Sequence, residues 1–159
     1  KPLYIRKITR LLNISLGTAH HALLSLEQNG VLSSYTQGRT KLYDLNVSHP
    51  AFDAFKLLNV LFLLNPLIDE LKTISSRIIL FGSYSRGTFT SQSDCEMFII
   101  TENTKNVLVQ IEQFAVRTKL SFRPVIRSED NRKELEKEDP FVFGQINRGF
   151  TLWDKSVGF

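Results

Sequence analysis

The chain has 159 residues, of which 42% are hydrophobic and 23% are charged. This balance is typical of a soluble globular protein, and the length allows one ordinary domain or two small ones. The single cysteine, Cys95, excludes an internal disulfide and fits a reducing compartment, so we expect a cytoplasmic protein. No secretory signal opens the sequence, and the apolar run 57–64, interrupted by Asn59, predicts a buried helix. We therefore expect no membrane partner.

The positive charge is confined to the first third of the chain. The formal net charge is +4. Residues 1–46 contain six Lys or Arg against two acids, whereas residues 47–159 contain fourteen of each. Such an asymmetry is expected when one segment contacts a polyanion and the rest does not, although chance could also produce it.

Residues 1–46 predict two helices and a hairpin. Apolar residues recur at helical spacing over 4–12, and Asn13-Ile14-Ser15 predicts a tight turn in which Ser15 is the N-cap of the next helix. That helix covers 16–29, with an apolar stripe at Leu16, Ala19, Leu23 and Leu26, and Gly30 ends it. Strands at 31–35 and 40–45 flank a turn at 36–39.

Residues 47–159 predict a second, α/β domain after a linker at 46–50. The apolar helix from Ala51 to about Leu64 is expected to stop there, because Asn65-Pro66 looks like an N-cap and N1 proline that restart a helix through Leu71. Strands are predicted at 77–81, 95–101 and 120–126, the last at an edge because of Pro124. A helix is predicted at 107–116, and two helices at 129–153, broken near Asp139-Pro140. Trp153 is expected to be a packing anchor.

The order helix, turn, helix, basic hairpin is that of a winged helix-turn-helix, whose second helix enters the major groove of double-stranded DNA. Gly17 would allow close backbone approach, Thr18 and His21 could contact base edges, and Arg39 and Lys41 would contact phosphates. The predicted DNA-binding residues are Ser15, Gly17, Thr18, His20, His21, Arg39 and Lys41. A role in protein contact or dimerisation alone is the alternative.

This segment resembles the winged helix-turn-helix of arsenical-repressor-type bacterial and archaeal regulators. The resemblance rests on the "N-I-S" turn, the pattern "L-x-x-L-E-x-x-G-V-L" and the wing "G-R-T-K-x-Y", and it covers nearly all of 1–46. It implies transcription regulation and a homodimer that reads two half-sites. Such domains usually have a further helix before this point, which is missing from this sequence or lies outside it.

The stretch "LFGSYSRGTFTSQSDCEMFII" resembles the minimal nucleotidyltransferase family of the DNA polymerase beta superfamily. That family combines a Gly-Ser, a nearby Arg-Gly and a Ser-Asp-x-Asp about ten residues later. The resemblance implies a nucleotidyltransferase-like domain over 47–159 that binds a nucleoside triphosphate. The expected fold class is α+β, with a winged helix-turn-helix followed by a small mixed-sheet α/β domain.

The chemistry of these residues fits phosphate and metal binding. Gly82 and Ser83 would cradle an anion together with backbone N–H groups, and Arg86 would support the loop or neutralise phosphate charge. Strand alternation is expected to place Asp94 and Glu96 on one face, where they would bind Mg²⁺ and act as the catalytic carboxylates. The predicted nucleotide-binding residues are Gly82, Ser83, Arg86 and Ser93.

Two departures from the family pattern weaken the metal site. Glu96 stands where the family has Asp, and the longer side chain displaces its oxygens from the octahedral geometry that Mg²⁺ requires. The third carboxylate, expected on the strand 120–126, is absent. Arg123 stands at that position and could pair with Asp94 or Glu96 in place of a metal. Glu129 and Asp130, which follow the strand, are the candidates to substitute for the third carboxylate.

Three functions remain open at this point. The first is a DNA-binding regulator whose degenerate nucleotidyltransferase-like domain senses a nucleotide. The second is an active, Mg²⁺-dependent enzyme that transfers a nucleoside monophosphate to a protein or small acceptor, as antitoxin-like relatives do. The third is an interaction module that is inert at both sites.

Overall fold

The computed structural model describes residues 1–157, without the side chains of Arg132 and Lys133. The chain divides into two compact units, Lys1–Phe55 and Lys56–Phe159. Helix α3 (Pro50–Leu71) crosses the division. The proposed boundary between residues 46 and 47 lies a few residues before this helix and stays a prediction.

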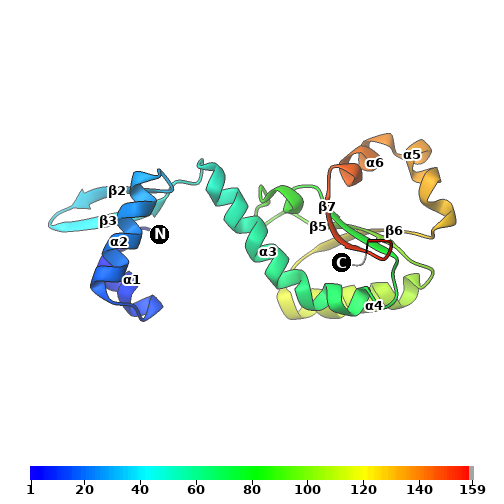
Figure 1. Cartoon of the computed structure of the whole chain (residues 1–159), viewed down its shortest axis with the longest axis horizontal. Helices are drawn as coiled ribbons and strands as arrows, with labels where there is room; N and C mark the ends of the chain where they lie inside the picture. Colours follow the sequence, from blue (N-terminus) through cyan, green and yellow to red (C-terminus); the bar gives the residue numbers. More distant parts are fainter. Residues whose placement is uncertain (158–159) are drawn as a thin grey trace. The chain divides into compact units, whose positions relative to one another are not determined.

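The first unit contains two helices and a small antiparallel sheet (Figure 1). Its sheet has the strand order β1-β3-β2. The predicted helices and hairpin are present, but the turn contains only Gly38 and Arg39, because Thr36 and Gln37 still pair with β3. Gly38 has φ +61, a conformation that suits glycine and allows such a short turn. In chain order the elements are β1 (Leu3–Tyr4), α1 (Ile5–Leu12), α2 (Leu16–Gln28), β2 (Leu32–Gln37) and β3 (Thr40–Leu45).

Local signals fix both ends of α2. The Ser15 hydroxyl accepts a hydrogen bond from the Thr18 N–H at 3.0 Å, which confirms Ser15 as the N-cap. Gly30 follows the helix with φ +73. Ala19 and Leu23 are buried as predicted, whereas Leu16 is 54% exposed. The prediction for Leu16 was wrong because the core of this small unit does not extend over the first turn of α2.

The second unit is a four-stranded mixed sheet with helices on both faces. The strand order is β6-β5-β4-β7, in which β5 and β6 are parallel and the other pairs are antiparallel. After α3, the elements in chain order are β4 (Arg77–Phe81), η1 (Tyr84–Arg86), β5 (Cys95–Ile100), α4 (Thr104–Thr118), β6 (Phe122–Arg127), η2 (Asp130–Lys133), α5 (Glu134–Glu138), α6 (Pro140–Asn147) and β7 (Phe150–Asp154). The described chain is therefore a mixed α+β protein with a mixed sheet and six α-helices.

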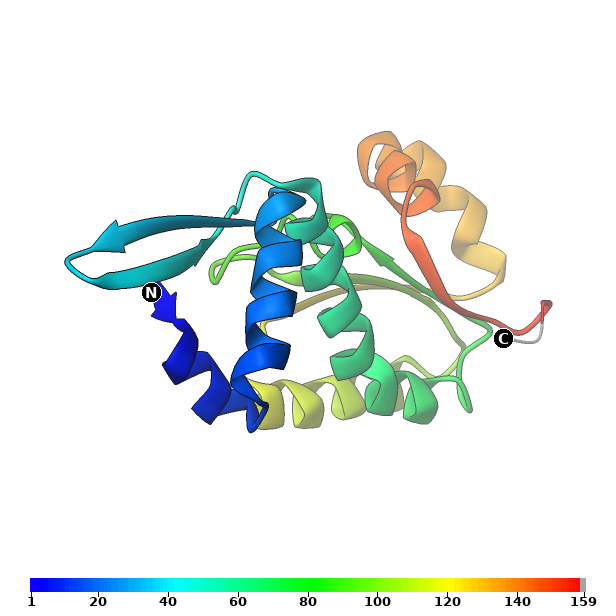
Figure 2. The same ribbon diagram turned by 60° about the vertical axis from the view of Figure 1, so that its left-hand side comes forward.

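Alternating side chains of β4 and β5 build two cores, one on each face of this sheet. Ile78, Leu80 and Met97 pack beneath the C-terminal part of α3 and α4. Ile79 and Phe98 instead pack against α5 and α6 on the opposite face. Figures 1 and 2 show these two helical layers with the sheet between them. Because both faces are covered, β4 and β5 appear in the sequence as continuous apolar runs.

Helix α3 is continuous through Pro66, which corrects the expected break at Asn65-Pro66. A proline inside a helix removes one hydrogen bond and costs about 3 kcal/mol. Leu64, Leu67 and Leu71 are completely buried on both sides of Pro66, and this burial outweighs that cost. The run 57–64 is buried only in part, since Leu64 is buried whereas Phe62 is 70% exposed. Among the described helices, α3 alone meets the length and composition expected of a membrane span.

The C-terminal segment contains a strand that was not predicted. Residues 150–154 form β7 and pair with β4, although the stretch 129–153 was predicted to be helical. Phe150, Thr151 and Trp153 are residue types that favour strands, and the helical prediction overlooked this local signal. Trp153 is the packing anchor that was expected, because its indole contacts the core and its N–H donates to the Ser75 carbonyl at 3.2 Å.

Strand β6 lies at the sheet edge, as Pro124 predicted.

Candidate active site

The Gly-Ser motif forms a sharp bend at the end of β4. Gly82 has φ +69, a left-handed conformation that glycine adopts without strain. The chain then enters the single turn η1 and leaves it at Gly87, which has φ +73. The Thr88 N–H and the Arg86 N–H both donate to the Ser83 carbonyl, at 3.1 and 3.3 Å. The bend is thus held by its own backbone.

The loop between the bend and β5 is also ordered by local contacts. The Ser93 hydroxyl accepts a hydrogen bond from the Thr90 N–H at 2.9 Å and therefore closes a turn. Tyr84 is buried and stacks on Phe89 with the ring centroids 4.2 Å apart. Arg86 is exposed. Of the four residues predicted to bind nucleotide, Gly82 and Ser83 form the bend, Ser93 supports the loop, and Arg86 extends into solvent.

Glu96 lies directly over the bend. It stands opposite Phe81 in the antiparallel pair β4–β5, next to the end of β4. A methyl group on residue 82 would lie 1.8 Å from Glu96 Oε2, so the carboxylate occupies the space that the absent side chain of Gly82 leaves. The space above Gly82, where a phosphate was expected to approach, is therefore occupied by a carboxylate of the chain itself.

Arg123 is the ionic partner of this carboxylate. Residues 96 and 123 are register partners in the parallel pair β5–β6, and Arg123 Nη1 lies 3.9 Å from Glu96 Oε1. The expectation that Arg123 pairs with one of the two acids is therefore confirmed for Glu96. The arginine side chain is 71% exposed, so solvent screens this contact and we assign it little stability.

The residues present do not fit a Mg²⁺ site with three carboxylates. Among the described residues, no three His, Cys, Asp or Glu side chains are grouped so that they could hold a metal ion. Glu129 and Asp130, the possible substitutes, line a different pocket of the sheet. The guanidinium beside Glu96 opposes a divalent cation there. Asp94 and Glu96 as metal ligands remain a prediction.

Asp94 borders a separate hollow of about 680 Å³ at the start of β5, and Glu96 is not among the residues that line it. Two lysines, Lys56 and Lys119, lie on its wall together with hydroxyl-bearing residues of the loop. Lys56 Nζ donates to the Phe89 carbonyl and lies 4.4 Å from the centre of the Phe89 ring.

These two lysines are functional candidates that sequence reasoning missed. Lys56 is one cation in an apolar helix, and Lys119 follows the end of α4 with φ +59. Neither belongs to the glycine-serine motif.

Burial changes the acid–base properties of two groups beside the site. Cys95 is completely buried, as predicted for a strand residue, and burial raises the pKa of its thiol to about 12. Burial also raises the pKa of the Tyr84 hydroxyl, with smaller effects from Cys95 and Asp94. Neither group is ionised near neutral pH, which excludes Cys95 as a nucleophile in the folded protein.

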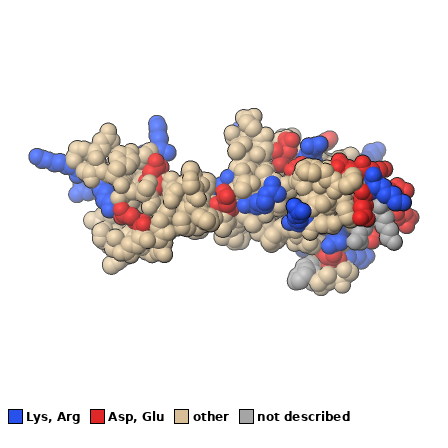
Figure 3. Space-filling model, turned by 90° about the horizontal axis from the view of Figure 1, so that it is seen from above, with Lys and Arg blue, Asp and Glu red and all other residues tan. Residues whose placement is uncertain are grey.

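The residues predicted to contact DNA lie on the first turns of α2 and on the β2–β3 hairpin. Gly17, Thr18, His20 and His21 are exposed on α2. Arg39 is exposed in the hairpin turn, whereas Lys41 Nζ lies 2.8 Å from Glu27 Oε2. This contact with Glu27 raises the pKa of the Lys41 ammonium. Figure 3 shows Lys and Arg side chains projecting from the end of the unit that the hairpin forms.

No curated protein matches the chain. Among solved structures, one match is a crystal structure from Sulfolobus solfataricus, provisionally assigned as a nucleotidyltransferase. It has 13% sequence identity and a TM-score of 0.44, and the match covers 72% of this chain and 97% of that one. A similarity at this TM-score is too low to establish a shared fold.

Residues 64–145, just over half of the chain, match the family model of the nucleotidyltransferase domain. The match includes the bend at Gly82 and Ser83, both acids of the Ser-Asp-x-Glu motif, and Arg123. The chain therefore belongs to the nucleotidyltransferase domain family.

Proposed function

We propose that this protein is a DNA-binding transcriptional regulator whose nucleotidyltransferase domain binds a nucleotide without transferring it. The observation that carries the loss of transfer is the occupation of the bend by Glu96, which pairs with Arg123 where the family pattern has a third acid. Because that carboxylate fills the space above Gly82, we place the nucleotide phosphates in the hollow beside Asp94, whose wall includes Lys56 and Lys119. We further propose that the protein is cytoplasmic and acts as a homodimer.

The first unit supports the DNA-binding half of this proposal. The start of its helix α2 is exposed, its hairpin is basic, and it has most of the excess positive charge of the chain. The Ser15 hydroxyl lies 2.8 Å from the Thr18 hydroxyl and stiffens the first turn of α2, which would insert into the major groove. Thr18 and His21 would contact base edges there.

The hairpin cations would have different roles. Lys41 pairs with Glu27 on α2, which also accepts a hydrogen bond from the Ser34 hydroxyl. These contacts tie the hairpin to the helix. A DNA phosphate near Lys41 would therefore compete with the Glu27 carboxylate for the ammonium group. Arg39 lies at the turn itself, and we assign it the main phosphate contact of the hairpin.

The DNA-binding proposal is tested by titrating duplex DNA at several salt concentrations. We expect binding that weakens steeply with salt, and Arg39→Ala should reduce the slope of log K against log salt by about 1. Lys105→Ala, which removes an exposed cation from the second unit, is the matched control and should leave the slope unchanged. No binding at low salt would contradict the proposal.

The nucleotidyltransferase proposal is tested by restoring the missing acid. Incubation of the wild-type chain with α-labelled ATP and Mg²⁺ should transfer no label. The double variant Glu96→Asp, Arg123→Asp removes the guanidinium, shortens the acid above Gly82 and adds a carboxylate at the register position beside it. We expect this variant, and not the wild type, to bind Mn²⁺ in a paramagnetic titration.

The same assay identifies the alternative function. Transfer of label by the wild-type chain that Asp94→Ala abolishes would show an active enzyme whose catalytic site includes Asp94. Mn²⁺ binding of equal strength in the wild type and the double variant would equally contradict the proposal. The homodimer is tested separately by sedimentation, where a monomer at all concentrations would exclude it.

A further inference from the structure

A pocket of about 450 Å³ opens between the sheet and the helices α5 and α6. It lies around Arg77 and Ile79 at the start of β4, whereas Gly82 follows the end of that strand. None of the residues of the glycine-serine motif lines it. Its volume is within the range of small-molecule sites.

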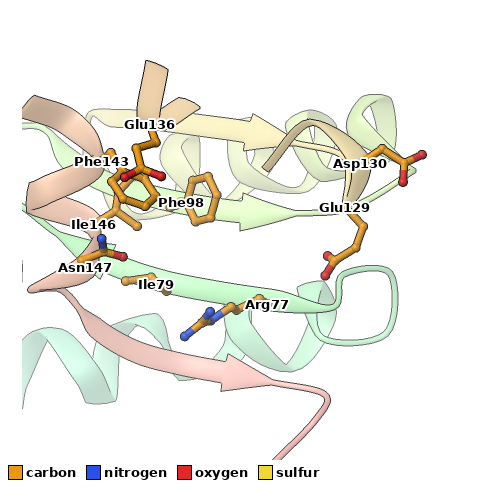
Figure 4. Close-up of a pocket in the computed structure, with 9 residues that line it drawn as sticks. All are labelled: Arg77, Ile79, Phe98, Glu129, Asp130, Glu136, Phe143, Ile146 and Asn147. Atoms are coloured by element: carbon orange, nitrogen blue, oxygen red, sulfur yellow. The ribbon is translucent and has the colours of Figure 1, made fainter. Parts of the chain in front are cut away.

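The floor and one wall of the pocket are apolar. Ile79 and Phe98 project from neighbouring strands, and Phe143 and Ile146 project from α6 (Figure 4). Phe98 and Ile146 are almost completely buried, so their positions are fixed by the core behind them. Such a rigid surface can hold the flat or branched body of a small molecule.

The polar groups of the pocket are mainly acidic. Figure 4 shows Glu136 extending from α5 over Phe143, and Glu129 extending towards β4, whereas Asp130 extends away from the pocket. Glu129 Oε2 accepts a hydrogen bond from the Ser76 hydroxyl at 3.2 Å, which holds its carboxylate towards β4.

Arg77, the cation that lines the pocket, forms an ion pair with Asp154. Arg77 Nε lies 3.1 Å from Asp154 Oδ2, and the two residues are register partners of the strands β4 and β7. The positive charge of Arg77 is therefore compensated outside the acidic side of the pocket. Among the described side chains that line the pocket, the two glutamates give it a net negative character.

We propose that this pocket binds a small organic cation, a primary amine with an aromatic or branched apolar body. The ammonium group would donate hydrogen bonds to the Glu136 carboxylate, with Glu129 adding favourable charge from the other side. The apolar body would lie on Phe98 and Ile146 beside Phe143. This assignment does not depend on nucleotide binding by the domain or on DNA binding by the first unit.

The proposal is tested with the full chain and a matched pair of fluorinated probes. 4-Fluorophenethylamine and 3-(4-fluorophenyl)propanoate have the same ring and spacer but opposite charge. In fluorine NMR titrations we expect saturable binding of the amine that is at least about tenfold tighter than that of the acid. Equal binding of the two probes, or no saturable binding of the amine, would overturn the proposal.

Substitutions then locate the site. Glu136→Gln removes an exposed charge from a helix surface and should weaken amine binding about tenfold. Glu112→Gln removes an equal charge from the exposed surface of α4, away from the residues that line the pocket, and should leave the affinity unchanged. Glu129→Gln is a second test should Glu136→Gln disturb α5. Unchanged affinity in both glutamate variants, or an equal loss in Glu112→Gln, would refute the assignment.

Discussion

The junction between α6 and β7 is predicted to tolerate no side chain at residue 149. A Cβ atom on Gly149 would lie 2.6 Å from Ile79 Cγ2, 2.7 Å from the Leu80 carbonyl oxygen and 2.9 Å from the Ile146 carbonyl oxygen. Two of these atoms belong to the backbone of β4 and of α6 and cannot rotate away. Gly149→Ala must therefore move β7 or α6 outward from β4, and overpacking of this kind costs about 2–3 kcal/mol.

The measurement is urea denaturation followed by the fluorescence of Trp153, the single tryptophan, which lies on β7. Gly144→Ala is the matched control, because this glycine is within α6 and a Cβ there would meet nothing within 4 Å. Alanine should raise the free energy of unfolding at that position by about 0.5–1 kcal/mol. Gly149→Ala within about 0.5 kcal/mol of the wild type, or an equal loss in Gly144→Ala, would refute the reasoning.

Two further predictions concern the core of the second unit. Leu64→Ala removes a completely buried side chain of α3 and should reduce the free energy of unfolding by about 2–5 kcal/mol, whereas Phe62→Ala, at a 70% exposed position, should change it by less than about 0.5 kcal/mol. Parallel urea denaturations would check both, and similar losses would contradict the burial of α3. Cys95 is expected to make stability depend on alkaline pH. The thiol titrates near 9.0 when unfolded and near 12 when folded, so the unfolded state alone loses its proton between these values. Stability should therefore fall as pH rises above 9, by about 1.4 kcal/mol at pH 10. Cys95→Ala should remove this part of the pH dependence, and identical pH profiles for the two proteins would disprove the assignment.

Strong local signals were sufficient to predict most of the elements. The apolar runs of β4 and β5 and the glycines at 30 and 82 each depend on a few neighbouring residues. The continuity of α3 could not be predicted in this way, because it depends on the burial of Leu64 and Leu67 by a sheet that forms from later residues. Strand β7 was missed although Phe150, Thr151 and Trp153 favour a strand, and its partner β4, which lies about seventy residues earlier, could not be identified from the local sequence.

The candidate site shows the same division between local and non-local information. The motif predicted the bend at Gly82 and the presence of an acid beside it. The Glu96 carboxylate lies in the space above Gly82 because of the register in which β4 and β5 pair. No local sequence pattern specifies this register. The hollow beside Asp94 joins lysines from α3 and from the end of α4, which are about sixty residues apart in the chain.

Strand β6 has one more consequence for the behaviour of this domain in solution. It is an outer strand of the sheet, and outer strands can recruit the strands of neighbouring molecules. Pro124 cannot supply an amide hydrogen to such an intermolecular ladder, and two copies of β6 would bring the guanidinium groups of Arg123 and Arg127 together. The cation that replaces an acid beside the bend thus also discourages polymerisation through this side of the sheet.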